Sequence, residues 1–328
     1  AAVLLPTGIV AVEATFDNTE AGHAELHDWI TSSTSDPRCG LEPSGGVGHA
    51  AAAHLQRNGI EVLLVPSRLS AREATRNRRR GKTDPGDAIA IARVVQREER
   101  LPAFRHGDDH EDLKLLVDYR DQLHHERTRV CNRLHADLAI AYPGYQRGIG
   151  KALTSQRSLN KVDQLLAADH SVRADLDRQR LERLREIDTE LKQVTIQLEA
   201  LVEAAGSTLT QIVGISTVIA ARLLGEVGDV RRFPSSSAFA ANNGTAPLDA
   251  SSGRNERHRL NRGGNRRVNR ALYTIAITQT RYEPRAVDYL APKRAAGHTR
   301  RGALRCLKRR LSDVIYRTML EDATRLGT

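Results

Sequence analysis

Three carboxylates stand where predicted secondary-structure elements begin or end. Glu42 ends a short predicted strand, and Asp84 and Asp87 lie three residues apart at the start of a predicted helix. Residues at that spacing share one helix face, so the two aspartates repel each other unless a cation lies between them. Mg²⁺ prefers such oxygen ligands and commonly takes one or two carboxylates with waters and substrate phosphates. The alternative is that both aspartates only complement the helix dipole.

The glutamate at a strand end and the helix-borne aspartates match the layout of RNase-H/RuvC-type nuclease sites. Strands alternate with helices over the first 100 residues, which indicates an α/β layer fold. Thr19 is a candidate helix cap, and Ile60–Val65 is an apolar, β-branched run typical of a buried parallel strand. In this setting two metal ions could clamp the attacking and leaving oxygens of a phosphoryl transfer. The metal site and the dipole role remain equal alternatives.

A second group of candidates lies in a polar, glycine-containing stretch of the C-terminal third. Ser251 and Ser252 precede Gly253, and Gly263–Gly264 precede a predicted helix. A serine in such a loop is either a phosphate hydrogen-bond donor or a nucleophile; alone, the donor role is favoured because serine needs activation. A carboxylate-bound metal, His258 or the arginines could supply that activation. The arginines that could clamp phosphates are Arg254, Arg257, Arg259, Arg262, Arg266, Arg267 and Arg270.

Positive charge is concentrated in the C-terminal third. The 328 residues hold 50 Lys plus Arg against 40 Asp plus Glu, a formal net charge of +10. Residues 207–328 hold 22 basic and 9 acidic residues, a net of +13, and the rest is net acidic. Such asymmetry predicts a polyanion partner for the last domain. A second basic stretch, with Arg78, Arg79, Arg80 and Lys82, precedes the Asp84 helix and is a further candidate for nucleic-acid contact.

Composition excludes several other classes of protein. Aromatic residues make up only 4%, which disfavours base stacking as the main mode of nucleic-acid binding. Cys39, Cys131 and Cys306 form no disulfide or metal spacing, so we expect a reducing, cytosolic compartment. No apolar run approaches the roughly 20 residues that span a bilayer, so we expect neither a membrane protein nor a secreted precursor.

The middle of the chain is helical and heptad-like. Its clearest seam has spacings of three and four residues and comprises Leu184, Ile187, Leu191, Val194, Leu198 and Leu201. This seam could belong to an antiparallel helical arm or a coil that joins two copies of the chain. Equally, it could pack two helices of the same chain against each other. Further on, Leu209–Gly214 and Ile215–Glu226 predict a helix, a glycine turn and a helix, whose backbone N–H groups could face a phosphate.

These sequences together resemble insertion sequence family 110, the transposases that join an N-terminal DEDD RuvC-like domain to a C-terminal serine domain. The matching segments, in order along nearly the whole chain, are Gly40–Gly45, Gly81–Ala88, Val213–Ser216, Ala240–Gly253 and Arg262–Arg267. The resemblance implies an α/β RNase-H/RuvC-like N-terminal domain, a helical coiled-coil middle and a mainly α C-terminal domain with a helix-hairpin-helix-like element. We place these domains at 1–103, 104–206 and 207–328.

The resemblance also implies roles for the candidates. Glu42, Asp84 and Asp87 take the family's second, third and fourth carboxylate positions and would bind Mg²⁺. Ser252, with Ser251 less favoured, takes the position of a serine nucleophile that cleaves and rejoins DNA through a phosphoserine intermediate. The implied partners are element-end and target DNA, a structured guide RNA and further copies of the chain, as a dimer or tetramer partly joined by the coil. The expected location is the bacterial cytoplasm, at the nucleoid.

One family position has no counterpart in this chain. The family's first aspartate lies on a strand just before the segment that aligns with Ala2–Leu5, and this chain begins at Ala1 without it. Glu13 and Asp17 are poor replacements because they lie on or after the next strand. We expect the missing ligand and strand to weaken metal binding and impair activity, whether through truncation, a mis-assigned start or a degenerate copy. The rival functions are a metal-dependent RuvC-like nuclease without a covalent intermediate and an inactive nucleic-acid-binding remnant.

Overall fold

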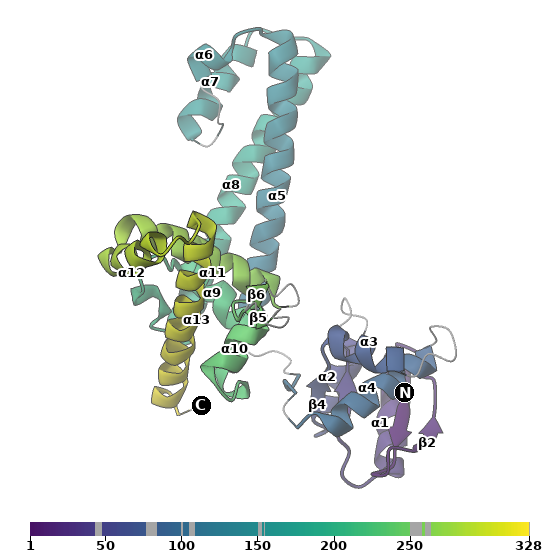
Figure 1. Ribbon diagram of the computed structural model, residues 1–328. Helices are drawn as coiled ribbons and strands as arrows, with labels where there is room; N and C mark the ends of the chain where they lie inside the picture. The colour runs from purple at the N-terminus through teal and green to yellow at the C-terminus, as the bar shows by residue number, and fades with distance from the viewer. Residues whose placement is uncertain are drawn as a thin grey trace. The chain divides into compact units, whose positions relative to one another are not determined.

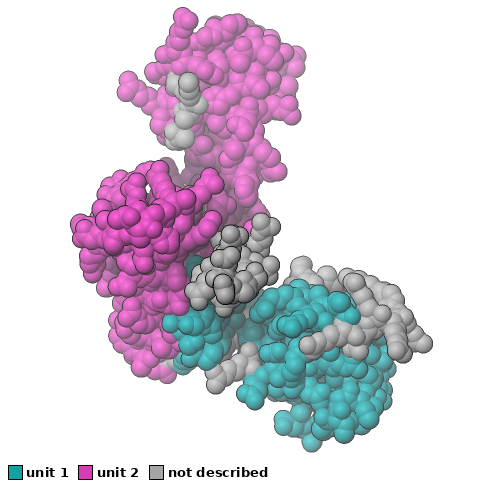
Figure 2. All heavy atoms as spheres, viewed as in Figure 1, with its two compact units in different colours: residues 1–111, 229–265 teal, residues 112–228, 266–328 magenta. Residues whose placement is uncertain are grey.

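The computed structural model forms two compact units, which Figure 2 colours separately. One comprises residues 1–111 with 229–265, and the other comprises 112–228 with 266–328 (Figures 1 and 2). The structure describes residues 1–42, 48–76, 84–99, 101–104, 109–149, 153, 155–249, 258–259 and 264–327. Within these ranges no helix is long and apolar enough to cross a membrane.

The N-terminal region is built of short strands and helices, as the sequence predicts. Its elements are β1 (Ala2–Leu4), β2 (Val10–Glu13), α1 (Glu20–Ser33), β3 (Cys39–Leu41), α2 (His49–Arg57), β4 (Val62–Leu64), α3 (Ser67–Arg76) and α4 (Asp84–Arg97). The β1–β2 pair is antiparallel, and the β3–β4 pair is parallel and joined through α2, so the predicted parallel strand is confirmed. Thr19 caps α1 as predicted, because its hydroxyl accepts a hydrogen bond from the amide of Gly22.

A close contact fixes how β3 lies against α4. A Cβ atom on Gly40 would lie 2.2 Å from Cγ2 of Val95 and 3.2 Å from Cγ2 of Ile91, so only glycine lets strand and helix approach this far. Arg38, just before β3, donates from Nη1 to the carbonyl of Val95 at 3.1 Å, and from Nη2 to the carbonyls of residues 98 and 99 at 3.2 Å. These carbonyls at the end of α4 lack helical partners, and a cation there also complements the helix dipole. The start of β3 is therefore attached to the end of α4.

The segment 229–265 forms a small substructure of its own. It contains the 3-10 turn η2 (Val230–Arg232), α10 (Ser236–Asn242) and the antiparallel pair β5 (Leu248–Asp249) and β6 (His258–Arg259). Phe233 packs edge-on against the fully buried Phe239, with ring centroids 5.3 Å apart. The backbone amide of Asn265 donates to the carbonyl of Asn242 at 2.6 Å and so joins the last residue of this segment to the end of α10.

Two long helices dominate the second unit. They are α5 (Asp109–Ala141) and α8 (Val172–Ala204), each about 50 Å long at the usual rise per residue (Figure 1). They run antiparallel, because Tyr119 reaches Glu190 while Glu126, further along α5, meets Arg183, earlier in α8. The predicted seam is buried from Leu184 to Leu198, with Leu201 half-buried. These cross-helix contacts support the interpretation of two helices packed within one chain.

The remaining helices of this unit lie at the two ends of the α5–α8 pair. At one end, α6 (Gln146–Ile149) and α7 (Gln156–Leu166) follow α5, and α7 contributes to a leucine-rich core with α5 and α8. At the other end lie η1 (Leu209–Gln211), α9 (Thr217–Val227), α11 (Arg266–Tyr282), α12 (Pro284–Ala295) and α13 (Arg300–Arg325). The predicted helix at Leu209–Gly214 is wrong, because only a single 3-10 turn forms before Gly214. The structure is thus mostly helical with few strands.

The packing of Gly40 gives a testable stability prediction. We expect Gly40→Ala to lower the free energy of unfolding by about 1–3 kcal/mol, because the added methyl group overlaps Val95. Urea unfolding followed by the fluorescence of Trp29, the chain's single tryptophan, reports this region. Gly148→Ala is the control for an added methyl group that meets nothing within 4 Å, and its unfolding is followed by circular dichroism because it lies in the other unit. Equal midpoints for wild type and Gly40→Ala would contradict the close approach.

Candidate active site

Glu42 stands directly after β3 and accepts a hydrogen bond from a serine that the sequence analysis did not select. The hydroxyl of Ser70, in α3, donates to Oε2 of Glu42 at 2.7 Å. Ser70 is only 5% exposed, and Glu42 is half-buried. A buried donor of this kind fixes the orientation of a carboxylate. The two residues are 28 positions apart, and nothing in the local pattern of α3 indicates that its serine faces a strand end.

The register of β3 and α4 directs Glu42 toward the acidic end of the helix. Arg38 lies at the last turn of α4, and Gly40 faces Ile91 and Val95, so the strand runs toward the beginning of the helix. Asp87, Ile91 and Val95 are spaced by four residues and therefore share one face of α4. The two residues from Gly40 to Glu42 advance the strand by about 7 Å, which corresponds to roughly four helical residues. Glu42 is thus level with the turn that carries Asp87.

The aspartates themselves occupy the first turn of α4, as predicted. Asp84 is exposed and Asp87 is half-buried. Carboxylates there interact favourably with the helix dipole, so the dipole role applies whether or not they also bind a metal. Among the described residues no group of three or more His, Cys, Asp or Glu side chains is placed to hold a metal ion. Glu42, Asp84 and Asp87 are all among these residues, so the structure does not bring the three together as a metal site, and their role as ligands stays a prediction.

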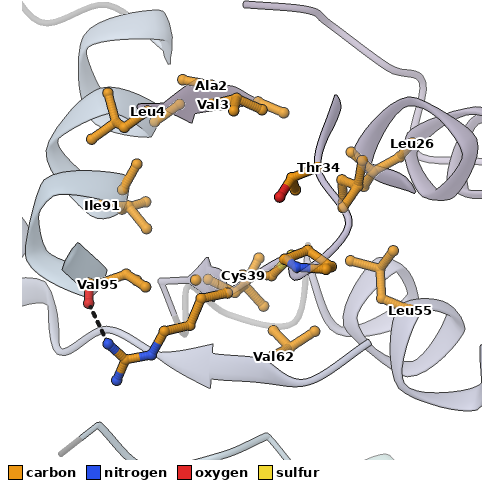
Figure 3. Close-up of a pocket in the computed structure, with 18 of the residues that line it drawn as sticks. Ala2, Val3, Leu4, Leu26, Thr34, Cys39, Leu55, Val62, Ile91 and Val95 are labelled. Atoms are coloured by element: carbon orange, nitrogen blue, oxygen red, sulfur yellow. Dashed lines mark hydrogen bonds between the residues drawn. The ribbon is translucent and has the colours of Figure 1, made fainter. Parts of the chain in front are cut away.

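Next to this site is an apolar cavity of about 780 Å³. Figure 3 shows β1, with Ala2, Val3 and Leu4, on one side of it and Cys39 and Val62 on the other, while Ile91 and Val95 come from α4. Within the described residues β1 pairs only with β2, and β3 only with β4, so both strands present an unpaired edge. Burial raises the pKa of the Cys39 thiol to about 11, so this thiol is protonated and unreactive at neutral pH.

The predicted nucleophile and many of the predicted nucleic-acid contacts lie outside the described residues. These are Ser252, with its neighbour Ser251, and the basic residues Arg78, Arg79, Arg80, Lys82, Arg254, Arg257 and Arg262. The backbone of Arg259 lies in β6, paired with Leu248. The roles of all these residues remain predictions.

The three predicted arginines of α11 are placed differently from one another. Arg267 forms ion pairs with Asp118 of α5 and with Glu226 of α9, the latter at 2.9 Å. The hydrogen bond to Asp118, then that to Glu226, raises the pKa of the guanidinium. These contacts favour a role in joining three helices. Arg266 and Arg270 are exposed, and Arg270 contributes to the positive field that lowers the pKa of Asp121.

The predicted glycine turn packs closely on α11. Gly214 has a positive φ of 90°, and a Cβ atom there would lie 3.2 Å from the carbonyl oxygen of Ile275. Gln279 of α11 donates to the carbonyl of Val213 at 2.8 Å, and the hydroxyl of Ser216 caps α9. The turn and the helix after it are therefore confirmed.

The order and content of these regions match known transposases. Residues 1–143, with all three carboxylates, match a family model described as "Transposase", for the DEDD domain of IS110 elements. Residues 206–291, with Ser252 and the arginines of α11, match the model described as "Transposase IS116/IS110/IS902 family". Together they define the class of the protein as a transposase.

Full-length similarity identifies the family within this class. An IS110 insertion element protein of 43.6 kDa from Streptomyces coelicolor is 25% identical, over 98% of this chain and 91% of its own length. An IS900 protein of 42 kDa from Mycobacterium paratuberculosis is 26% identical over 93% and 88%, respectively. The transposase of element IS1328 from Yersinia enterocolitica is 28% identical over 62% and 59%. The chain belongs to the IS110 family of insertion-sequence transposases.

Proposed function

We propose that this chain cleaves and rejoins DNA strands during transposition, with Ser252 as nucleophile and Glu42, Asp84 and Asp87 as ligands of Mg²⁺. The observation that carries the proposal is the order of the two family matches, one spanning the carboxylates and the other the serine. The β3–α4 register supports it, because it brings Glu42 level with the turn of Asp87. These three carboxylates belong to an RNase-H/RuvC-like site in this proposal.

The proposed reaction is a pair of exchanges at one phosphorus atom. Oγ of Ser252 attacks the scissile phosphodiester, and a phosphoserine ester forms as the bond from phosphorus to one sugar oxygen breaks. The serine proton passes to a basic group, for which the carboxylates and His258 are the candidates, and the leaving sugar oxygen takes up a proton. Rejoining reverses these steps with a hydroxyl group of another strand and regenerates Ser252.

The residues around Glu42 suit Mg²⁺ by the chemistry of their donors. Carboxylate oxygens are its preferred protein ligands, and one or two of them suffice when waters and substrate phosphates complete the shell. Ser70 holds one oxygen of Glu42, as the outer-shell partners of metal ligands commonly do. A bound Mg²⁺ would supply positive charge beside the scissile phosphate.

The partners follow from the family and from the distribution of charge. We propose element-end and target DNA as substrates, a structured RNA as guide, and a homo-oligomer as the active form, acting at the nucleoid in the bacterial cytoplasm. The net charge of +13 over residues 207–328 supports the polyanionic partners.

The serine is tested through its covalent product. The full chain would be incubated with element-end duplex, Mg²⁺ and RNA from the source, then resolved on denaturing gels. We expect a protein–DNA band that Ser252→Ala abolishes and Ser251→Ala retains, because only Ser252 bonds to phosphorus. DNA nicking that persists in Ser252→Ala without any adduct would instead indicate a metal-dependent nuclease. DNA binding with neither adduct nor nicking in any chain would indicate a remnant.

Ser70 is a proposed positioning residue for the same site. We expect Ser70→Ala to raise the Mg²⁺ concentration needed for half-maximal cleavage roughly 10-fold, because Glu42 loses its orienting donor. Ser70→Thr keeps the hydroxyl and should restore the wild-type concentration. If Ser70 only stabilises the fold, Ser70→Ala would lower the amount of folded protein and leave the Mg²⁺ concentration for half-maximal cleavage unchanged. That result would contradict the assignment.

A further inference from the structure

One face of the second unit is built jointly by α11 and α13. The two helices pack side by side (Figure 1). The ammonium of Lys308, on α13, donates to Oδ1 of Asn269, on α11, at 2.6 Å and lies 6.0 Å from the ring centroid of Tyr273. Asn269 and Tyr273 are four residues apart and share one side of α11.

This face is rich in cations and poor in carboxylates. Helix α11 carries four arginines and no acidic residue, and the first half of α13, residues 300–312, carries six basic residues and no acidic residue. The cations of that half are Arg300, Arg301, Arg305, Lys308, Arg309 and Arg310. The last turn of α12 adds Lys293 and Arg294, and no acidic residue occurs between residues 289 and 312.

The nearby carboxylates are already engaged with other cations. Asp313 pairs with Arg309, Asp118 and Glu226 pair with Arg267, and Asp121 pairs with Arg222. Throughout the part of the chain that the structure describes, no carboxylate forms an ion pair with Arg301, Arg305 or Lys308. These three cations are therefore available for an external anion, as are Arg266 and Arg270 of α11, for which the described residues show no ion pair either.

The cluster includes mutual repulsion that an anion would relieve. Lys308 is half-buried, and burial, followed by the charge of Arg305, lowers the pKa of its ammonium. Like charges held close together without a counter-ion raise the free energy of the protein, and a polyanion bound across them would lower it. Arg301 and Arg305 are exposed and one helical turn apart, so they form a row along the outer side of α13.

The form of the face favours the backbone of a duplex over a single strand. Single-strand binding usually depends on several aromatic rings open to stacking with bases, whereas the ring beside the cations of α11 and α13 is that of Tyr273, which is 48% exposed and has the Lys308 ammonium 6.0 Å from its centroid. The ring of Tyr289 likewise has Lys293 and Arg310 near it. A row of cations on a straight helix instead suits the regularly repeated phosphates of duplex DNA.

We propose that Arg301, Arg305 and Lys308, with Arg266 and Arg270 of α11, form a docking face for the phosphate backbone of duplex DNA, separate from the serine and carboxylate residues. The family matches end at residue 291, so the α13 part of this face lies beyond both of them. The inference rests on the proposed function only in taking DNA as the partner. Its contacts are to phosphate, so it would anchor DNA without reading sequence.

This docking face is tested by measuring DNA binding with a chain that cannot cleave DNA. The full chain carrying Ser252→Ala would be titrated into a fluorescent duplex of arbitrary sequence, with anisotropy read at several salt concentrations. In this background, the double change Arg301→Gln with Arg305→Gln should weaken binding at least 10-fold. It should also reduce the magnitude of the slope of log affinity against log salt concentration by about 2, because two phosphate contacts are lost. The control pair, Arg285→Gln with Arg317→Gln, removes the same charge from exposed positions elsewhere and should change affinity less than two-fold.

Several outcomes would overturn the proposal. Equal losses for the two double variants would mean that only net charge matters. Unchanged duplex binding, with weakened binding of a structured RNA, would assign the face to RNA. Arg301→Lys with Arg305→Lys keeps the charge and should retain most of the affinity; if it binds as weakly as the glutamine pair while folded by circular dichroism, the phosphate-contact account fails.

Discussion

The antiparallel register of β3 and α4 is the constraint on which the candidate active site depends. Arg38 attaches the start of the strand to the last carbonyls of the helix, and Gly40 lets the two backbones approach until strand and helix side chains touch. With one end fixed and the spacing set, Glu42 has to lie level with the first turns of α4. This register directs the strand end that carries Glu42 toward the helix start that carries Asp84 and Asp87, although 42 residues separate Glu42 from Asp84 along the chain. Within the described residues the three carboxylates do not form a metal-binding group.

The two units differ in the electrostatics that they present. The N-terminal region places Asp84 and Asp87 at the positive end of a helix, where the helix dipole stabilises their negative charge. The second unit carries a cationic surface on α11 and the first half of α13, which hold no acidic residue, and the nearby Asp118, Glu226 and Asp313 are used in internal ion pairs. Arg267 is exposed like Arg266 and Arg270, but its charge pairs with carboxylates of α5 and α9, whereas the described residues show no ion pair for the other two arginines.

The sequence analysis predicted correctly those features whose signal lies within a single helix or strand. The β-branched run at Ile60–Val65, the cap at Thr19 and the heptad seam of α8 each carry their own periodicity or end signal, and the structure has all three. The partners of Arg38, Glu42 and Arg267 could not be predicted, because they lie 28 to 149 residues away and no spacing rule links them. The failed helix at Leu209–Gly214 has a similar cause: the turn at Gly214 is set by its packing on α11, which limits the preceding segment to one 3-10 turn.

The claim that Glu42 and Asp87 serve one metal ion is tested most directly by a double-mutant cycle on metal affinity. Mn²⁺ binding would be measured by electron paramagnetic resonance for the wild type, Glu42→Gln, Asp87→Asn and the double variant. Shared ligation predicts that each single change weakens binding at least 10-fold and that the double change adds little, a coupling of about 1 kcal/mol or more. If the losses of Mn²⁺ affinity from the two single changes simply add in the double variant, the two residues do not share one ion. Mn²⁺ binding that neither change weakens would also contradict the proposed site.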